Sequence, residues 1–515
     1  MWCSWPINRR WMAVGTVLVA LAIGGTEPRA QDDLAARLLE NGDQLQRDGK
    51  VEQARAAWSD VVAHHPDSPA APAALDRLGT SLYAVETFDL RGRQTGETTL
   101  EQAREIFERL ATNYRTAPEA SRAAFKLGLL FSDPVSPFLD LDDAYGWFSS
   151  IVTVYPDSAY LDRGLYGLAT ILFQQGKVRQ SLRPASRLLA DAPDSPITDR
   201  VRFLAARALI RLGDLDGALR LLQAVLDVTP DSPLASASRD RLTHLVRLMR
   251  AGEAAAVPMY DRFGRIVPRL PAEWRLRTVS GLATDPADHL LVVDGRAGVV
   301  HLLDGRGRPV GRVAARRATA AWADGGQVLV GTPDGVVIGG RSHTLVLPGG
   351  TQTVSDVGFV ARDTARRIIV WDRKAGRVLR FRRDFSFDKD LISGRDGRVD
   401  AVAGGADGSI AVLDARRRVI TIYAEAGGSR QVRLAPEEHL RRPSALALDF
   451  AGNLVVLDRS AREVGVFTPQ GKEIARVVSG RGPDDPFPDP TYLAVNNRGE
   501  ILIYDRKHDA IVVLR

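Results

Sequence analysis

Residues able to do chemistry are sparse in this sequence. The eight histidines lie at positions 64, 65, 244, 289, 301, 343, 439 and 508, and no two share a helix face with a glutamate between them, as a zinc protease requires. The sequence also has no nucleophile elbow, phosphate loop or dinucleotide fingerprint. Asp140, Asp142 and Asp143 lack the spacing of a calcium loop, so we predict that they cap a helix. No catalytic residue, metal ligand or cofactor is predicted.

Composition excludes further classes of site. Cys3 is the single cysteine of 515 residues, which excludes a disulfide framework and cysteine-based zinc or iron-sulfur centres. The chain is 45% hydrophobic and 26% charged, as in globular proteins, and its length predicts two to four domains at roughly 100–200 residues each. The net charge of +6 is too small an excess to argue for nucleic acid.

The amino end has the features of a leader. Arg9 and Arg10 precede an apolar run over residues 11–25, and polar residues begin at Gln31. We therefore predict a secretory signal peptide over residues 1–30 with cleavage after Ala30, and an uncleaved anchor is the alternative. No later segment is long and apolar enough for a transmembrane span.

Helical periodicity runs through residues 31–250. Five segments share a small residue followed by apolar residues four and seven positions later, which lie on one face of an α-helix. They start at Ala54, Ala103, Ala144, Ser181 and Ala218. Each helix should stop twelve residues after its small residue, at a proline in four cases, and the Asp-Ser that follows should cap the next helix. These pairs predict an all-α solenoid.

The helix pairs resemble tetratricopeptide repeats, specifically the Pro-Asp-Ser type of envelope-assembly proteins of Gram-negative bacteria. The resemblance rests on the Pro-Asp-Ser segments and on the turns Gly49-Lys50, Gly176-Lys177 and Gly213-Asp214, each five residues before the small residue. It implies a curved surface that holds a peptide or partner protein. Together with the leader, it implies a periplasmic location.

A different pattern follows a linker at residues 251–258. From residue 278, short β-rich runs alternate with Gly and Asp turns, and one block recurs six times. Asp294, Asp372, Asp414, Asp458 and Asp505 close the second strand of five blocks, and Gly331 takes this place in the second block. The intervals of 37 to 47 residues match a propeller blade of four short strands. The sequence therefore predicts an all-β six-bladed propeller.

The propeller is predicted to close with both of its ends. The last block stops after its third strand, at residues 511–514. The segment from Tyr260 to Arg265 resembles the turn between the third and fourth strands of blade one, so residues 259–271 are predicted to complete blade six. Closure would remove an exposed sheet edge and give a domain over residues 259–515.

The propeller blocks resemble NHL repeats, most clearly in blades five and six. In blade six, Gly480, Gly482, Phe487 and Pro490 precede the first strand. The resemblance implies a six-bladed propeller that mostly binds protein.

Charge separates the two halves. Residues 31–250 contain 26 basic and 30 acidic residues, whereas residues 251–515 contain 40 and 32. In a propeller, the turns between second and third strands share a face with the connections between blades. We predict that this basic face binds an anionic partner, such as an acidic protein surface or a phosphorylated or uronic envelope glycan. The candidate residues are Arg296, Arg316, Arg317, Arg373, Lys374, Arg416, Arg417, Arg418, Arg441, Arg442, Arg459, Arg506 and Lys507.

A solvated rim of mixed charge is the alternative to a binding face. The strand-closing aspartates lie in the same loops and would cancel much of the positive charge. Arg462, four residues after Asp458, is an example of an arginine that would then pair within its own blade.

Taken together, these patterns predict a non-enzymatic exported scaffold of the bacterial cell envelope, which binds envelope proteins or peptides and no nucleic acid. The alternative is a metal-dependent hydrolase or lyase, similar to lactonases, with the repeats as a targeting domain. A metal on the propeller axis needs carboxylates, His or Asn from several inner strands. His301 and His343 lie within strands of blades one and two, and we expect each on an outer strand.

Overall fold

The computed structural model describes residues 28–86, 96–133, 136–253, 260, 263–324, 327–350, 352–363, 366–393, 398–405, 408–424, 428–434, 439–480 and 485–515. Nearly all of the predicted signal peptide and most of the predicted linker lie outside these residues. The chain divides into two compact units, Met1–Ala123 and Ala124–Arg515. Within the described ranges, every helix is too short or too polar to cross a membrane.

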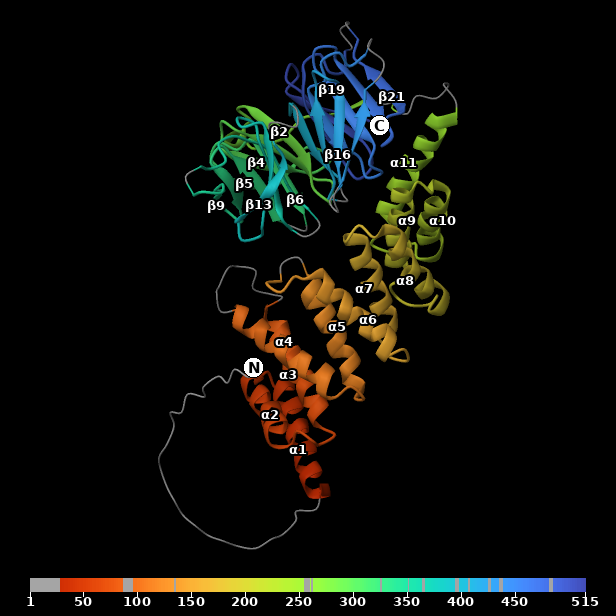
Figure 1. Ribbon diagram of the computed structural model, residues 1–515, viewed down its shortest axis with the longest axis vertical. Helices are drawn as coiled ribbons and strands as arrows, with labels where there is room; N and C mark the ends of the chain where they lie inside the picture. Colours follow the sequence, from red (N-terminus) through yellow and green to blue (C-terminus); the bar gives the residue numbers. More distant parts are fainter. Residues whose placement is uncertain are drawn as a thin grey trace, which may run out of the picture. The chain divides into compact units, whose positions relative to one another are not determined.

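Eleven helices are described in the amino-terminal half (Figure 1). They are α1 (Pro28–Arg47), α2 (Val51–His64), α3 (Ala71–Glu86), α4 (Gly96–Asn113), α5 (Pro118–Ser132), α6 (Leu141–Val154), α7 (Leu161–Gln174), α8 (Val178–Asp191), α9 (Thr198–Leu212), α10 (Leu215–Val228) and α11 (Ala235–Glu253). The predicted apolar stripes lie on α2, α4, α6, α8 and α10, and all of their side chains are at most 2% exposed. Each of these helices ends two residues before its predicted stop. The helical repeat prediction is confirmed.

Helix capping follows the prediction in one place and departs from it in another. The Asp140 carboxylate accepts the backbone N–H groups of Asp142 and Asp143 and so caps α6, as predicted. In contrast, no side chain caps α9. Ser195, which precedes α9, instead donates its hydroxyl to Asp162, 2.5 Å away, in the preceding repeat. Ser232 makes the same bond to Asp199, so these serines connect adjacent repeats.

Six four-stranded antiparallel sheets follow, which confirms the predicted six blades. Blades one and two contain β2 (Val279–Thr284), β3 (Leu290–Asp294), β4 (Val299–Leu303) and β5 (Pro309–Ala314), and then β6 (Ala320–Asp324), β7 (Gln327–Thr332), β8 (Gly335–Ile338) and β9 (Arg341–Thr344). Blades three and four contain β10 (Val357–Arg362), β11 (Ile368–Asp372), β12 (Arg377–Phe381) and β13 (Phe387–Ile392), and then β14 (Ala401–Gly404), β15 (Ile410–Asp414), β16 (Val419–Tyr423) and β17 (Ser429–Arg433). Blades five and six contain β18 (Ala445–Leu448), β19 (Leu454–Asp458), β20 (Glu463–Phe467) and β21 (Glu473–Val478), and then β22 (Pro490–Val495), β23 (Ile501–Asp505), β24 (Ala510–Leu514) and β1 (Phe263–Ile266).

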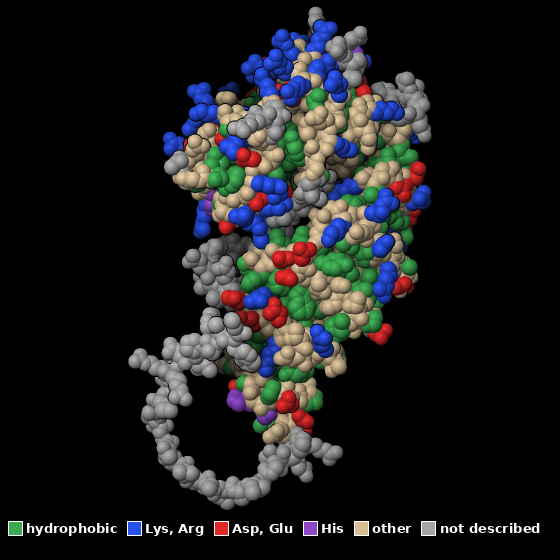
Figure 2. All heavy atoms as spheres, viewed as in Figure 1, with side chains coloured by type: hydrophobic (Ala, Val, Ile, Leu, Met, Phe, Trp, Pro, Cys, Tyr) green, Lys and Arg blue, Asp and Glu red, His purple; other side chains and the backbone are tan. Residues whose placement is uncertain are grey.

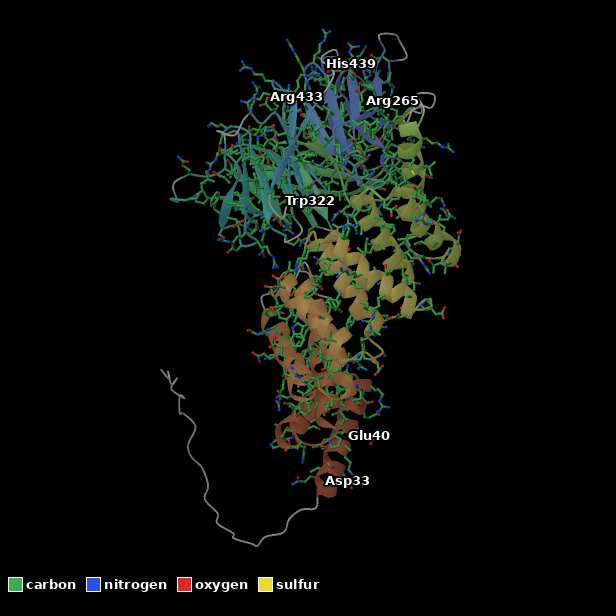
Figure 3. The ribbon with its side chains drawn as sticks, turned by 45° about the vertical axis from the view of Figure 1, so that its right-hand side comes forward. Asp33, Glu40, Arg265, Trp322, Arg433 and His439 are labelled. Atoms are coloured by element: carbon green, nitrogen blue, oxygen red, sulfur yellow. The ribbon has the colours of Figure 1, made fainter. Side chains whose placement is uncertain are left out.

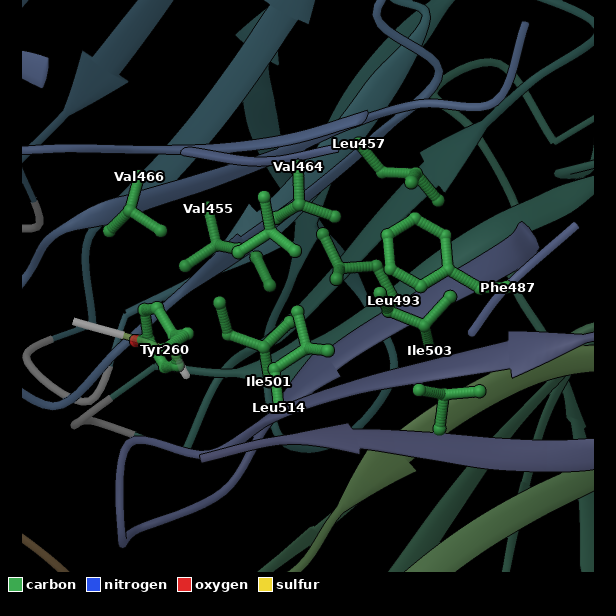
Figure 4. Packing of buried hydrophobic residues seen from close by; sticks show 13 residues of the cluster. Tyr260, Val455, Leu457, Val464, Val466, Phe487, Leu493, Ile501, Ile503 and Leu514 are labelled. Carbon is green, nitrogen blue, oxygen red and sulfur yellow. The ribbon is translucent and has the colours of Figure 1, made fainter. Parts of the chain in front are cut away.

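Blade six is closed by strands from both ends of the propeller. β1 pairs antiparallel with β24, and Phe263 lies opposite Leu514 in the register. The predicted closure is therefore confirmed. A core between blades five and six contains Tyr260, Phe487 and Leu514, each at most 5% exposed (Figure 4). The closing segment thus contributes both backbone pairing and buried apolar surface.

Helix α11 packs against two turns of the propeller. His244 is 1% exposed, and its Nε2 lies 3.2 Å from a carboxylate oxygen of Asp449, in the turn between β18 and β19. Its ring also contacts Phe450, with 5.1 Å between ring centroids. In the turn between β22 and β23, Gly499 has a φ of +71°, and a Cβ there would lie 2.1 Å from His244 Nδ1. Only glycine satisfies both the backbone conformation and this close approach.

Replacing Gly499 with alanine is expected to loosen α11 from blade six. The matched control is Gly452→Ala, because Gly452 has a φ of +81° but its Cβ would meet only Pro469 Cγ at 3.7 Å. Both substitutions carry the left-handed backbone cost of about 1–2 kcal/mol, and only the first displaces His244. Hydrogen exchange of the α11 amides should therefore accelerate in the Gly499 variant alone. Equal exchange in the two variants would contradict the importance of this contact.

Candidate partner-binding face of the propeller

The turns between second and third strands and the linkers between blades form one surface, which we call the loop face. In blades one, three and six, a backbone bond joins this turn to the linker before the blade, as from Arg373 N to Asp356 O (2.8 Å) and from Arg506 N to Asp489 O (3.0 Å). Others join the turn to the next linker, as from Ser479 N to Arg462 O (2.9 Å). The two sets of predicted basic loops therefore share a face.

The strand-closing aspartates are buried below the loop face and bind backbone N–H groups of its loops. Asp294, Asp372, Asp458 and Asp505 are at most 2% exposed. In blade five, the Asp458 carboxylate accepts the N–H groups of Arg442 (2.6 Å) and Ala461 (2.9 Å). Burial raises the pKa of Asp458, but these hydrogen bonds outweigh it and leave the pKa below its ordinary value. These four carboxylates therefore bind backbone donors and do not form an acidic rim.

Three arginines of the loop face are held by aspartates of the linkers. Arg373 binds both carboxylate oxygens of Asp356, at 2.8 and 3.2 Å. Arg459 and Arg506 share Asp489, at 3.1 and 2.7 Å. Burial raises the pKa of Asp489, but the hydrogen bonds from these two guanidinium groups outweigh burial and leave the pKa below its ordinary value. Pairing of this kind orders the loops and partly neutralises the charge of these three arginines.

Two further candidates and Arg462 have local contacts. Arg418, whose φ is +56°, donates from Nη2 to the backbone oxygen of His439 at 2.6 Å. Arg417 lies 3.7 Å from Asp414 and is 70% exposed, so this pair contributes little. Arg462 pairs with Asp485 of the next linker at 3.0 Å, and not with the aspartate of its own blade.

The remaining candidates point to solvent without an acidic neighbour. They are exposed, and none has a carboxylate within ion-pair distance among the residues that the structure describes. Figure 2 shows Lys and Arg side chains crowded over the end of the propeller that carries β19 and β21. This unpaired set is Arg296, Arg316, Arg317, Lys374, Arg416, Arg441, Arg442 and Lys507.

Sequence reasoning missed a cavity beside Arg417. It has a volume of about 380 Å³ and is also lined by Arg398 and Arg433. Arg433 lies on the outer strand β17, outside the loops that the sequence analysis considered, whereas Arg398 lies in the connection between blades three and four and was not among the candidates.

Histidines and carboxylates do not gather into a metal site within the described ranges. His301 lies on β4, the third strand of blade one, and is 1% exposed. Burial lowers the pKa of His301, and its ring lies near Trp274 of the short 3-10 helix Ala272–Trp274. His343 lies on the outermost strand β9 and stacks on Phe385, with 3.7 Å between ring centroids. His343 thus lies on the outermost strand, as expected, whereas His301 lies on the third of the four strands of its blade.

Comparisons with known proteins give one family match and several solved structures of low sequence identity. Residues 166–236 match the tetratricopeptide repeat family. A streptogramin B lyase structure is 9% identical, with 49% of this chain and 97% of that chain covered and a TM-score of 0.36. A luciferin-regenerating enzyme is 15% identical (49% and 96% covered, TM-score 0.38). The calcium-binding protein regucalcin of Agrobacterium tumefaciens is 14% identical (49% and 92%, TM-score 0.37). No curated protein matches the sequence.

Proposed function

We propose that this protein is a non-enzymatic interaction scaffold of the bacterial cell envelope, which binds partner proteins through its helical repeats and through the loop face. Tetratricopeptide repeats followed by a closed propeller form the architecture of a protein-interaction scaffold. The observation that carries the proposal is the unpaired set of eight cationic side chains on one face. Clustered arginine suits carboxylates, so the partner presents an acidic surface.

The position of α11 supports the loop face as the free side of the propeller. Helix α11 contacts the turns between first and second strands of blades five and six, through Asp449 and Gly499. These turns open on the face opposite to the loop face, because each strand of a blade reverses direction. The unpaired set therefore lies away from the α11 contact.

Export to the periplasm is the second part of the proposal. It rests on residues 1–30, where a basic start and an apolar run precede polar residues. Cleavage after Ala30 would leave Gln31 at the amino terminus of the mature protein, which amino-terminal sequencing of the expressed chain would detect.

Charge reversal of the loop face is expected to abolish binding to an acidic surface. The variant combines Arg296→Glu, Arg316→Glu, Arg416→Glu and Arg441→Glu, none of which breaks an ion pair among the described residues. Arg418 is left intact because its bond to His439 and its positive φ hold the loop. Retention on a polyglutamate matrix should fall to that of an uncharged matrix, since eight units of charge are changed.

The control carries the same charge change at exposed residues outside the loop face. It combines Arg265→Glu, Arg306→Glu, Arg430→Glu and Lys472→Glu, which lie on outer strands or in turns between third and fourth strands. This variant should keep most of the retention. Equal loss in both variants would mean that net charge alone, and not the loop face, causes binding.

A further inference from the structure

We propose that the surface of α7 and α9, beside the contact between α11 and the propeller, binds a short segment of a partner protein that carries both acidic and aromatic side chains. This inference rests on the proposed function, because it names the kind of segment that the helical repeats hold. The surface is separate from the unpaired set of the loop face. All residues involved belong to the unit Ala124–Arg515.

The repeat period assigns equivalent positions to three helices. Three residues spaced by four lie on one side of each helix. They are Tyr166, Thr170 and Gln174 on α7, Phe203, Arg207 and Arg211 on α9, and Asp240, His244 and Leu248 on α11. We call the side that these nine residues mark the repeat face.

The propeller covers the repeat face at α11. Asp240 pairs with Arg498, in the turn between β22 and β23, at 3.2 Å. His244 lies against Asp449, as described above, and Leu248 packs against the core between blades five and six. On α7 and α9 the equivalent side chains are partly exposed. The repeat face of these two helices therefore continues from an existing interface within the chain.

Two arginines at this face lie on aromatic rings of the preceding helix in the set. The guanidinium carbon of Arg207 lies 4.8 Å from the ring centroid of Phe173 on α7. That of Arg241, on α11, lies 4.5 Å from Phe203 and 5.3 Å from Phe450 of the propeller. A guanidinium group placed on a ring keeps the N–H groups at its edge for an acceptor.

These two arginines lack a counter-charge. Among the residues that the structure describes, neither has a carboxylate within ion-pair distance, and the buried Nε of Arg241 has no acceptor. Asp240 and Asp288 pair with Arg498 instead, at 3.2 and 3.5 Å. Burial lowers the pKa of Arg207 and of Arg241, and the charge of Arg207 lowers the pKa of Arg241 further. A carboxylate from a partner would offset the cost of burying these cations.

The aromatic rings of this surface call for an apolar group as well. Tyr166, Phe203 and Phe450 are partly exposed, and a carboxylate cannot cover their rings. An aromatic side chain of the partner would bury this apolar surface and stack on the open side of a guanidinium group. Polyglutamate has no apolar side chain, so its retention reports on the loop face and not on this surface.

The spacing of the helices favours a peptide over a small anion. Helix α7 packs against α9, and packed helices lie roughly 8–10 Å apart. Because Arg207 reaches over α7 and Arg241 over α9, the two guanidinium groups are about one helix spacing apart. An extended chain rises about 3.3 Å per residue, so acidic residues two or three positions apart would reach both, with an aromatic residue between them. A single small anion would reach only one.

The test is fluorescence anisotropy of the whole protein with a labelled six-residue peptide of alternating glutamate and tyrosine. Two matched peptides replace either every glutamate with glutamine or every tyrosine with serine. The first peptide should bind at least tenfold more tightly than either matched peptide, since a hydrogen bond to a charged group and a buried aromatic side chain are each worth about tenfold or more. Equal binding of either matched peptide, or no binding of the first, overturns the proposal.

Variants locate the site. Arg207→Gln combined with Arg241→Gln should weaken binding at least tenfold, and far-UV circular dichroism checks that the helices remain folded. Thr170→Glu offers Arg207 a carboxylate from α7 and should also weaken binding without removing an arginine. The matched control, Arg265→Gln with Arg433→Gln, removes the same charge from exposed residues of the outer strands β1 and β17 (Figure 3). It should leave binding unchanged, and equal loss in the control overturns the site.

A loop-face variant separates this inference from the proposed function. Arg296→Gln combined with Arg316→Gln removes the same charge from the unpaired set and should leave binding of the peptide of glutamate and tyrosine unchanged. Loss of peptide binding in this variant, with binding retained in the variant of Arg207 and Arg241, overturns the site on the helices. Polyglutamate retention that survives charge reversal of the loop face would count against the proposed function alone.

Discussion

Replacing Phe487 with alanine is expected to destabilise the contact between blades five and six by about 3–5 kcal/mol, the usual cost of truncating a buried aromatic side chain. Phe487 is fully buried, and it packs with Val464, Leu493 and Ile503 in the core between these blades (Figure 4). Because the residue comes from the linker, the cavity would open at the junction of the two blades. Hydrogen exchange of the amides in β19, β20, β22 and β23 should accelerate accordingly.

Two further variants make this result specific. Leu440→Ala removes the equivalent side chain between blades four and five, which is 3% exposed, and should cost about 2–5 kcal/mol. Val478→Ala, at a side chain of blade five that is 59% exposed, should change stability by no more than about 0.5 kcal/mol. Similar small effects in all three variants would refute the role of the linker side chains in joining blades.

The periodic features of both halves could be predicted from the sequence, because each is repeated. Stripes such as Ala54, Trp58 and Val61 recur with the helical period, and a misreading of one repeat is corrected by the others. The closing strand β1 was also predictable, since a ring of six blades lacks only one strand and a matching turn precedes the first block.

Side-chain partners across the chain could not be predicted in the same way. Sequence spacing favoured Ser195 as a helix cap, but its partner Asp162 lies one repeat away. The spacing of Arg462 and Asp458 in the sequence suggests an ion pair within one blade. The Asp458 oxygens instead accept backbone N–H groups, and Arg462 pairs with Asp485 of the next linker. Such pairings depend on which loops meet in three dimensions, and a single strand period carries no information about that.

The candidate site was predicted in outline and not in composition. The sequence placed thirteen basic residues on one face, and the structure divides them into the unpaired set and those held by Asp356, Asp489 and other local acceptors. Arginines at equivalent positions of different blades thus differ in whether a local acceptor already binds them. The cavity at blade four was missed because no repeated position marks it, and repeat detection emphasises agreement.

Replacing Asp458 with asparagine is expected to lower the free energy of unfolding at pH 7 by about 1.5–3 kcal/mol, the value of hydrogen bonds to a charged acceptor. The buried carboxylate accepts three donors: Arg442 N, Ala461 N and the Ser460 hydroxyl, at 2.6, 2.9 and 2.7 Å. An asparagine amide would direct an NH₂ group at backbone donors. Urea unfolding followed by circular dichroism measures the loss.

The pH dependence of this loss follows from the lowered pKa of Asp458. A carboxyl group whose pKa is depressed on folding stabilises the native state above its unfolded value, near about 4, and this contribution disappears as pH falls through the folded value. The deficit of Asp458→Asn should therefore be complete at pH 7 and shrink below about pH 4. Asp414→Asn is the matched control, because among the described residues Asp414 accepts the N–H of Arg417 and no linker N–H, and its deficit at pH 7 should be smaller. Equal deficits at pH 7 would show that the bond between closing aspartate and linker does not stabilise the blades.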